Sequence, residues 1–222
     1  MMKRFVVITL FPEMFEPVLG SSMMWKAQKD QKAEFQLINL RDYGLGPRRQ
    51  VDDKPFGGGS GMLLMIEPLT RAIERARQIL PRAKVLLMTP AKTVWDQKQA
   101  QLHAKNDDDY IIVCGRYEGF DARVEGLVDE KISVGRYVLT GGELPAMIVI
   151  DSIVRLLPGV LGGGDEATAI ESYSQLDALE YPQYTRPEEY EGERVPEVLL
   201  SGNHDLIGKW RREHQIDLSA DS

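Results

Sequence analysis

Residues 110–121, YIIVCGRYEGFD, begin with five apolar residues and continue into a polar stretch with two glycines. A short apolar run bounded by glycine is typical of a buried strand. Two other segments share this arrangement: KVLLMT (84–89) runs into MTPA (88–91), and KISVG (131–135) runs into SVGRYVLTGGELP (133–145). Ligands of open α/β sheets bind at the carboxyl ends of the strands. The three segments together therefore predict a ligand pocket at one sheet edge, where Gly115, Gly119, Gly135, Gly141 and Gly142 let the backbone approach a flat ring.

Two more apolar runs, RFVVITL (4–10) and FQLINL (35–40), bring the predicted strands to five. Between strands, EPLTRAIERARQIL (67–80) repeats its apolar residues at helical spacing on one face. Strands that alternate with helices predict an α/β domain with a largely parallel sheet. The segment LPAMIVIDSIVRLLPG (144–159) is apolar almost all round, so it predicts a buried helix that ends at Pro158 and is a candidate for packing against a partner.

The composition changes after Pro158. Residues 159–172, GVLGGGDEATAIES, are rich in glycine and acidic residues, which predicts a flexible loop. Farther on, DLIGKWRREH (205–214) predicts a short helix that Ser201 or Asn203 caps. We therefore divide the chain into a large domain over 1–158, an interdomain loop over 159–173 and a small C-terminal region over 174–222.

The bulk composition limits the classes of function. The chain has 222 residues, a net charge of −7, one cysteine and three histidines. A disulfide framework is excluded and a structural zinc site is disfavoured. The apolar N-terminal run is too short to span a bilayer, so we expect a cytoplasmic protein without membrane contact. The negative charge argues against non-specific coating of nucleic acid, although RDYGLGPRRQVDDK (41–54) and GKWRREH (208–214) are local basic stretches.

Residues 51–62, VDDKPFGGGSGM, contain four glycines within five positions. They are not a dinucleotide fingerprint, because no strand precedes them. They are not a phosphate loop either, because Met62 and Leu63 stand where lysine and serine or threonine are needed. Taken alone, the stretch predicts a turn between elements. The lone cysteine, Cys114, lies in an apolar strand with no histidine nearby in sequence, which favours a structural thiol over a nucleophile.

Seven motifs occur in the order in which one family has them: LFPEMF, VDDKPFGGGSGM, VCGRYEGFDARV, YVLTGGELPAM, RLLPGVLG, YTRP and VPEVLLSGNH. From residue 9 to about 212, the chain resembles the bacterial tRNA (guanine-37-N1)-methyltransferases. The resemblance implies a SPOUT-type α/β fold with a deep trefoil knot, S-adenosylmethionine bound in that knot, and an obligate homodimer with a shared active site that acts on tRNA with guanine at position 37. The chain stops soon after WRREH, so we also expect a short, reduced C-terminal helical region and weaker or differently organised tRNA binding.

The resemblance also implies the residues of the site. The cofactor would contact Met88, Thr89, Pro90, Gly115, Tyr117, Glu118, Gly119, Ser133, Val134, Gly135, Tyr137, Leu139, Gly141, Gly142 and Pro145. The target guanine would lie in a cradle made by Gly57, Gly58, Gly59 and Gly61, and Asp52 and Asp53 would lie near the anticodon loop. Glu118 is similar to a glutamate implicated in the magnesium dependence of the family, so the resemblance extends to Mg²⁺.

Methylation of guanine N1 requires a base that takes the N1 proton and a cation near O6, where negative charge develops. Arg155 lies four residues after Asp151 on the apolar helix, which places the two side chains on one face. From the residues alone, they could form an ion pair or line a pocket, or Arg155 could interact with the helix C-terminus. The resemblance makes Arg155 the catalytic cation.

The general base is where the sequence departs from the family pattern. The family has an aspartate after the flexible loop, whereas this chain has Glu171, in a loop one residue longer. We expect Glu171 to be the base, with Asp165 and Glu166 as rivals. Arg136 also stands where the family usually has an acidic residue. The alternative function is a catalytically impaired RNA-binding dimer of the same fold.

Overall fold

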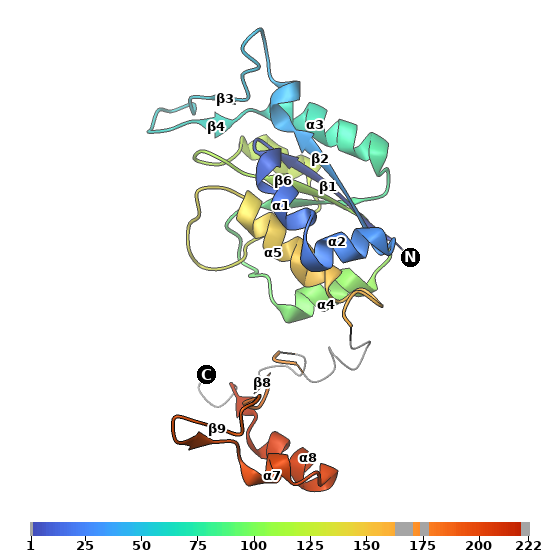
Figure 1. The fold of residues 1–222 in the computed structure, drawn as a ribbon. Helices are drawn as coiled ribbons and strands as arrows, with labels where there is room; N and C mark the ends of the chain where they lie inside the picture. Colours follow the sequence, from blue (N-terminus) through green and yellow to red (C-terminus); the bar gives the residue numbers. More distant parts are fainter. Residues whose placement is uncertain (1, 163–170, 174–177, 219–222) are drawn as a thin grey trace. The chain divides into compact units, whose positions relative to one another are not determined.

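The computed structural model describes residues 2–162, 171–173 and 178–218 (Figure 1). The chain forms two compact units, Met1–Gly162 and Gly163–Ser222. In the described part of the chain, no helix is long and apolar enough to cross a membrane.

A parallel sheet of five strands forms the centre of the first unit. The strands lie in the order β2, β1, β6, β5, β7, and their bounds are β1 Lys3–Thr9, β2 Ala33–Asn39, β5 Lys84–Met88, β6 Tyr110–Cys114 and β7 Glu130–Ile132. In the register, Tyr110 of β6 is the partner of both Phe5 and Lys84. All five predicted strands are confirmed. The last one ends earlier than predicted, because the Ser133 hydroxyl donates to the Gly135 carbonyl where the chain turns.

Helices cover both faces of this sheet (Figure 1). One face carries α1 Glu16–Leu19, α2 Ser22–Lys29 and α5 Glu143–Val154, with α4 Gln97–Lys105 beside α5, and the other carries α3 Ile66–Ile79. Short 3-10 helices cover Pro12–Met14, Leu40–Tyr43 and Ala122–Leu127. Alternation along β1 explains the two layers: Phe5 and Val7 point to the α5 side, whereas Val6 and Ile8 point to α3.

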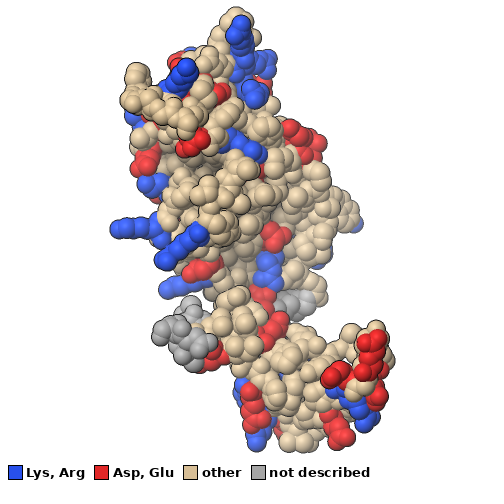
Figure 2. Space-filling view, turned by 90° about the vertical axis from the view of Figure 1, so that its left-hand side faces the viewer, with Lys and Arg blue, Asp and Glu red and all other residues tan. Residues whose placement is uncertain are grey.

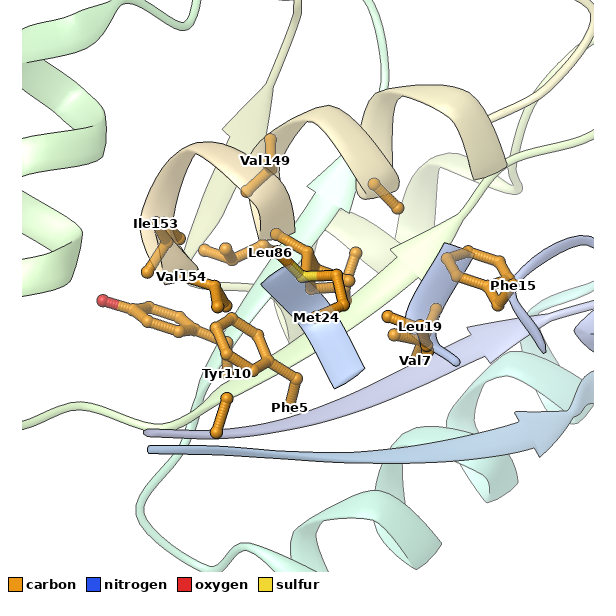
Figure 3. Close-up of a cluster of buried hydrophobic side chains, with 14 of the residues drawn as sticks. Phe5, Val7, Phe15, Leu19, Met24, Leu86, Tyr110, Val149, Ile153 and Val154 are labelled. Atoms are coloured by element: carbon orange, nitrogen blue, oxygen red, sulfur yellow. The ribbon is translucent and has the colours of Figure 1, made fainter. Parts of the chain in front are cut away.

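The core on the α5 side joins the sheet to its helices (Figure 3). Its labelled members are Phe5, Val7, Phe15, Leu19, Met24, Leu86, Tyr110, Val149, Ile153 and Val154. The rings of Phe5 and Tyr110 lie 5.8 Å apart between centroids. Burial of an aliphatic or aromatic side chain of this size stabilises the fold by about 1.5–3 kcal/mol. This packing makes the strands a rigid base for the loops that leave their carboxyl ends.

The apolar helix α5 differs from the prediction at its end and on one face. It ends at Val154, with Arg155 as its C-cap, rather than continuing to Pro158. Pro158 disfavours helical geometry at Leu157. The Leu156 and Leu157 amides donate to carbonyls three residues earlier, so these two residues form turns instead of continuing the helix. The helix is also not buried all round, because Leu144 and Ile148, four residues apart on one face, are 53% and 46% exposed.

A small hairpin extends from the first unit. Its strands, β3 Asp52–Asp53 and β4 Leu63–Leu64, pair in the antiparallel direction and close the loop over 54–62. The glycine-rich stretch is therefore a hairpin loop, as its composition alone predicted.

In its described residues, the second unit contains two more strand pairs and two helices. Strand β8 Ala178–Leu179 pairs with β11 Ile216–Asp217, and β9 Glu189–Tyr190 pairs with β10 Glu193–Arg194. The helices are α7 Glu197–Leu200 and α8 His204–Glu213. Of the two predicted caps of α8, the structure assigns Asn203, whose side-chain oxygen accepts hydrogen bonds from the Asp205 and Leu206 amides at 3.1 and 3.2 Å.

Candidate active site

The loops that follow β5, β6 and β7 surround one cavity of about 210 Å³. Backbone hydrogen bonds join these loops: the Thr89 amide donates to the Ile132 carbonyl at 3.0 Å, and the Gly142 amide donates to the Gly115 carbonyl at 2.8 Å. The lining includes every residue that the resemblance assigns to the cofactor, namely Met88, Thr89, Pro90, Gly115, Tyr117, Glu118, Gly119, Ser133, Val134, Gly135, Tyr137, Leu139, Gly141, Gly142 and Pro145. Three segments that are distant in sequence thus form one pocket.

Sequence reasoning missed five lining residues: Arg116, Phe120, Ile132, Val138 and Thr140. Each lies inside one of the three segments that predicted the pocket. Their place in the sequence could have identified them, because a loop that lines a cavity also contributes the residues next to its glycines. Their side chains add an arginine, a hydroxyl and three apolar groups to a site otherwise predicted to be mainly backbone.

Most of the pocket glycines have a packing role that was not predicted, whereas their predicted approach to a flat ring stays a prediction. A β-carbon at Gly142 would lie 2.6 Å from the Gly115 nitrogen, and one at Gly115 would lie 2.8 Å from the Phe120 ring. Added β-carbons at Gly135 and Gly141 would also collide with protein atoms. At Gly141 and Gly142 the missing side chain lets two loops pack together, whereas at Gly115 and Gly135 it makes room for an aromatic ring of the same loop. Of the five predicted glycines, only Gly119, where φ is +123°, has open space at the position of the missing side chain.

A buried ion pair lies beside the pocket. The Arg116 Nε and the Glu143 Oε2 are 2.9 Å apart, and their side chains are 19% and 1% exposed. The Thr9 hydroxyl donates to the other Glu143 oxygen at 2.9 Å, and the guanidinium carbon lies 4.4 Å from the centroid of the Phe11 ring. Neither Arg116 Nε nor Glu143 Oε2 has a hydrogen-bond partner within the described residues, so their attraction is electrostatic. The pair joins the loop after β6 to the start of α5.

Two residues of the β6 segment have unusual environments. Tyr117 has φ of +59°, in the left-handed region that residues other than glycine rarely adopt, and it lines the pocket. Burial and, secondly, the Glu143 charge raise the pKa of the Cys114 thiol well above 9.0, against a smaller lowering by Arg116. A buried, neutral thiol is a poor nucleophile, which agrees with the structural role predicted for Cys114.

The β3–β4 hairpin contacts the pocket loop directly. The Glu118 amide donates to the Met62 carbonyl at 3.0 Å, and the Leu64 amide donates to the Gly119 carbonyl at 2.9 Å. A β-carbon at Gly61 would collide with the Glu118 side chain, so the hairpin lies against this pocket residue. Of the predicted substrate residues, the structure thus brings Gly61 against the pocket, whereas Asp52, Gly57, Gly58 and Gly59 belong to the same hairpin without a described contact to the pocket. The four glycines all have positive φ, from +81° to +123°.

The predicted catalytic pair is divided between the two units. Arg155 is the half-buried C-cap of α5 in the first unit, whereas Glu171 belongs to the second. Their pairing stays a prediction. The rival bases, Asp165 and Glu166, lie outside the described residues. Glu118 lines the pocket, but the described residues contain no group of three His, Cys, Asp or Glu side chains that could hold a metal.

Fold and site together define an α/β protein with a loop-lined pocket at the carboxyl edge of a parallel sheet. Residues 2–221 match the family described as tRNA (Guanine-1)-methyltransferase TrmD. The chain belongs to this family.

Similar proteins agree with this assignment. The tRNA (guanine-N(1)-)-methyltransferase of Syntrophotalea carbinolica is 50% identical over 96% of this chain and 85% of its own length. That of Bacillus subtilis is 48% identical over 94% of this chain and 86% of its own. Among solved structures, the tRNA (m1G37) methyltransferase from Aquifex aeolicus is 39% identical, with a TM-score of 0.79 over 96% of this chain and 89% of that one.

Proposed function

We propose that this protein transfers the methyl group of S-adenosylmethionine to N1 of guanine 37 in tRNA. The observation that carries the proposal is the pocket, in which three strand ends gather every residue expected at the cofactor site, in a chain of the methyltransferase family. The hairpin with the guanine-cradle glycines lies against Glu118 at the side of that pocket.

The pocket suits S-adenosylmethionine in its chemistry. Backbone groups at strand ends offer hydrogen bonds to a purine edge, and the open space at Gly119 admits a flat group close to the main chain. When bound, the cofactor supplies an electrophilic methyl group on a sulfonium. Backbone contacts from the loops around the cavity fix its orientation.

Arg155 and Glu171 carry out the proton chemistry in this proposal. The Glu171 carboxylate accepts the N1 proton of guanine, and the Arg155 guanidinium stabilises the negative charge on O6. Glutamate has the same proton chemistry as the aspartate of the family pattern, with one more methylene of reach. A single-turnover methylation assay of Glu171→Gln beside Asp165→Asn tests the assignment. Loss of transfer only in the first variant supports it, and transfer retained there refutes it.

The assembly belongs to the proposal as well. We include a SPOUT-type fold with a deep trefoil knot, a homodimer and a cytoplasmic location. The similarity to the Aquifex aeolicus enzyme supports the fold, and the exposed Leu144 and Ile148 on α5 support a partner subunit. The domain over 1–158 holds the cofactor site, 159–173 connects the parts, and 174–222 is the reduced helical region that contacts tRNA.

The only candidate ligand proposed from the sequence is Glu118, and one carboxylate is an incomplete site, although Mg²⁺ is often held by one or two carboxylates plus substrate. The proposed proton chemistry therefore uses protein side chains alone.

Calorimetry and a methyl-transfer assay test the function together. We expect the purified chain to bind S-adenosylmethionine and to methylate transcripts with guanine at positions 36 and 37, but not those with adenine at 37. Binding without transfer would support the alternative, an RNA-binding dimer that has lost turnover. Absence of cofactor binding would overturn both the function and the assigned pocket.

A further inference from the structure

Phe56 is the most exposed large apolar residue in the described part of the chain, at 101%. A single exposed apolar side chain is ordinary in itself, so its location has to carry the argument. Phe56 occupies the second position of a turn in which the Gly58 amide donates to the Pro55 carbonyl at 3.4 Å. Gly57, the third position, has φ of +87°, as a type II turn requires. The turn places the aromatic ring at the corner of the hairpin loop.

The hairpin that carries Phe56 is fixed to the pocket. Its loop is closed by the pairing of Asp53 with Leu63, and the Met62 carbonyl accepts the Glu118 amide at 3.0 Å. Phe56 precedes Met62 by six residues, which can span at most about 20 Å even when fully extended. The ring therefore lies within reach of a substrate that enters the pocket beside Glu118.

The surroundings of Phe56 favour RNA. Lys54, two residues before it, is exposed, and so is Arg48 in the preceding loop, where the neighbouring Arg49 pairs with Asp42 at 2.8 Å. Figure 2, which views the molecule from the hairpin side, shows Lys and Arg side chains at the same upper end of the first unit as these loops. Cations next to an exposed ring suit a single-stranded nucleic acid, whose phosphates pair with the cations while its bases stack on the ring.

We infer that Phe56 is a stacking platform for an unpaired base of the tRNA anticodon loop, and that it positions the target guanine for transfer. This inference rests on the proposed function and adds a positioning residue to it. Stacking needs a flat ring, so Phe56→Trp should preserve the contact, whereas Phe56→Ala and Phe56→Leu should lose it.

Single-turnover methylation of a transcript with guanine at 37, with enzyme in excess, measures the effect. Loss of one base–aromatic stack corresponds to a change of roughly tenfold. We expect Phe56→Ala and Phe56→Leu to lower the saturating rate constant by about this factor, with S-adenosylmethionine binding unchanged. The matched control is Leu102→Ala, which truncates a 53% exposed apolar side chain on α4 and should leave the rate unchanged.

A binding measurement separates this inference from the proposed function. The tryptophan of Phe56→Trp should be quenched when the transcript saturates the enzyme, beyond any quenching in the wild type, and this signal needs no turnover. If the wild type methylates RNA but Phe56→Ala and Phe56→Leu behave like Leu102→Ala, the inference fails and the function stands. If Phe56→Ala changes the molecular mass by light scattering, the ring is a subunit contact, and the inference also fails.

Discussion

At Gly142 the absence of a side chain allows two pocket loops to touch. An added β-carbon would lie 2.6 Å from the Gly115 nitrogen and 2.9 Å from the Cys114 Cα, and these main-chain atoms cannot retreat without moving β6. We predict that Gly142→Ala destabilises the protein by about 1–3 kcal/mol, the usual cost of overpacking, and weakens S-adenosylmethionine binding. Urea denaturation and calorimetry measure the two effects. Gly126→Ala is the control, because a β-carbon there meets open space, and an equal loss in both variants would contradict the argument.

The Glu143 charge is expected to matter more than that of an exposed acid. Glu143→Gln can keep the hydrogen bond from Thr9, but it leaves the Arg116 guanidinium without its anion. Breaking a fully buried pair costs about 3–5 kcal/mol. Because Arg116 retains some exposure, we predict a loss of about 2 kcal/mol in the free energy of unfolding. Glu125→Gln, which breaks an exposed pair with Lys131, should cost less than about 0.5 kcal/mol. Equal losses of unfolding free energy in the two variants would show that the Arg116–Glu143 pair stabilises the protein no more than an exposed pair does.

The Cys114 thiol should be unreactive in the native protein over a wide pH range. A free thiol forms more of its reactive thiolate as the pH rises toward its pKa. Burial raises the pKa of Cys114 well above 9.0, so the native thiol stays protonated and covered from pH 7 to 9. A chromogenic disulfide reagent measures this directly, because the chain has one cysteine. We expect reaction only after unfolding in urea, and rapid native reaction at pH 8 would contradict the assignment.

At the scale of single elements, the cap of α8 gives a local prediction. Asn203 accepts two backbone amides at the start of the helix. Asn203→Ala should therefore cost about 1 kcal/mol of local stability, whereas Asn203→Asp should retain the cap. Hydrogen exchange of peptides that cover His204–Glu213 in the full chain measures the change. Exchange in the alanine variant should be faster than in the aspartate variant, and equal exchange would exclude a capping role.

The elements also show what the sequence could and could not predict. All five strands of the sheet were predictable, because a strand buried on both faces is a continuous apolar run. The same apolar runs predicted that the carboxyl ends of three strands meet at one edge of the sheet. The ion pair near the pocket was not, since Arg116 lies in the loop after β6 and Glu143 at the start of α5, and no local pattern links them. The packing role of the pocket glycines was hidden for the same reason: Gly142 touches Gly115, which lies on another strand end.

For the molecule as a whole, the exposed face of α5 predicts the assembly. The helix is apolar and its inner residues are fully buried, yet Leu144 and Ile148 face outward with about half of their surface exposed. Two large side chains four residues apart on an apolar helix are a natural contact for a second copy of the chain. We expect light scattering to give twice the chain mass of 25.1 kDa.

Charge on this face should separate the subunits. A glutamate buried in an apolar contact loses its hydration without gaining a partner, so the double variant Leu144→Glu and Ile148→Glu should be monomeric. If the active site is shared between subunits, as the proposed function holds, this variant should also lose methyl transfer. Leu102→Glu is the control, because Leu102 on α4 has the same 53% exposure as Leu144 and should leave the mass unchanged. A dimeric double variant would place the subunit interface elsewhere, and a monomeric wild type would refute the shared site.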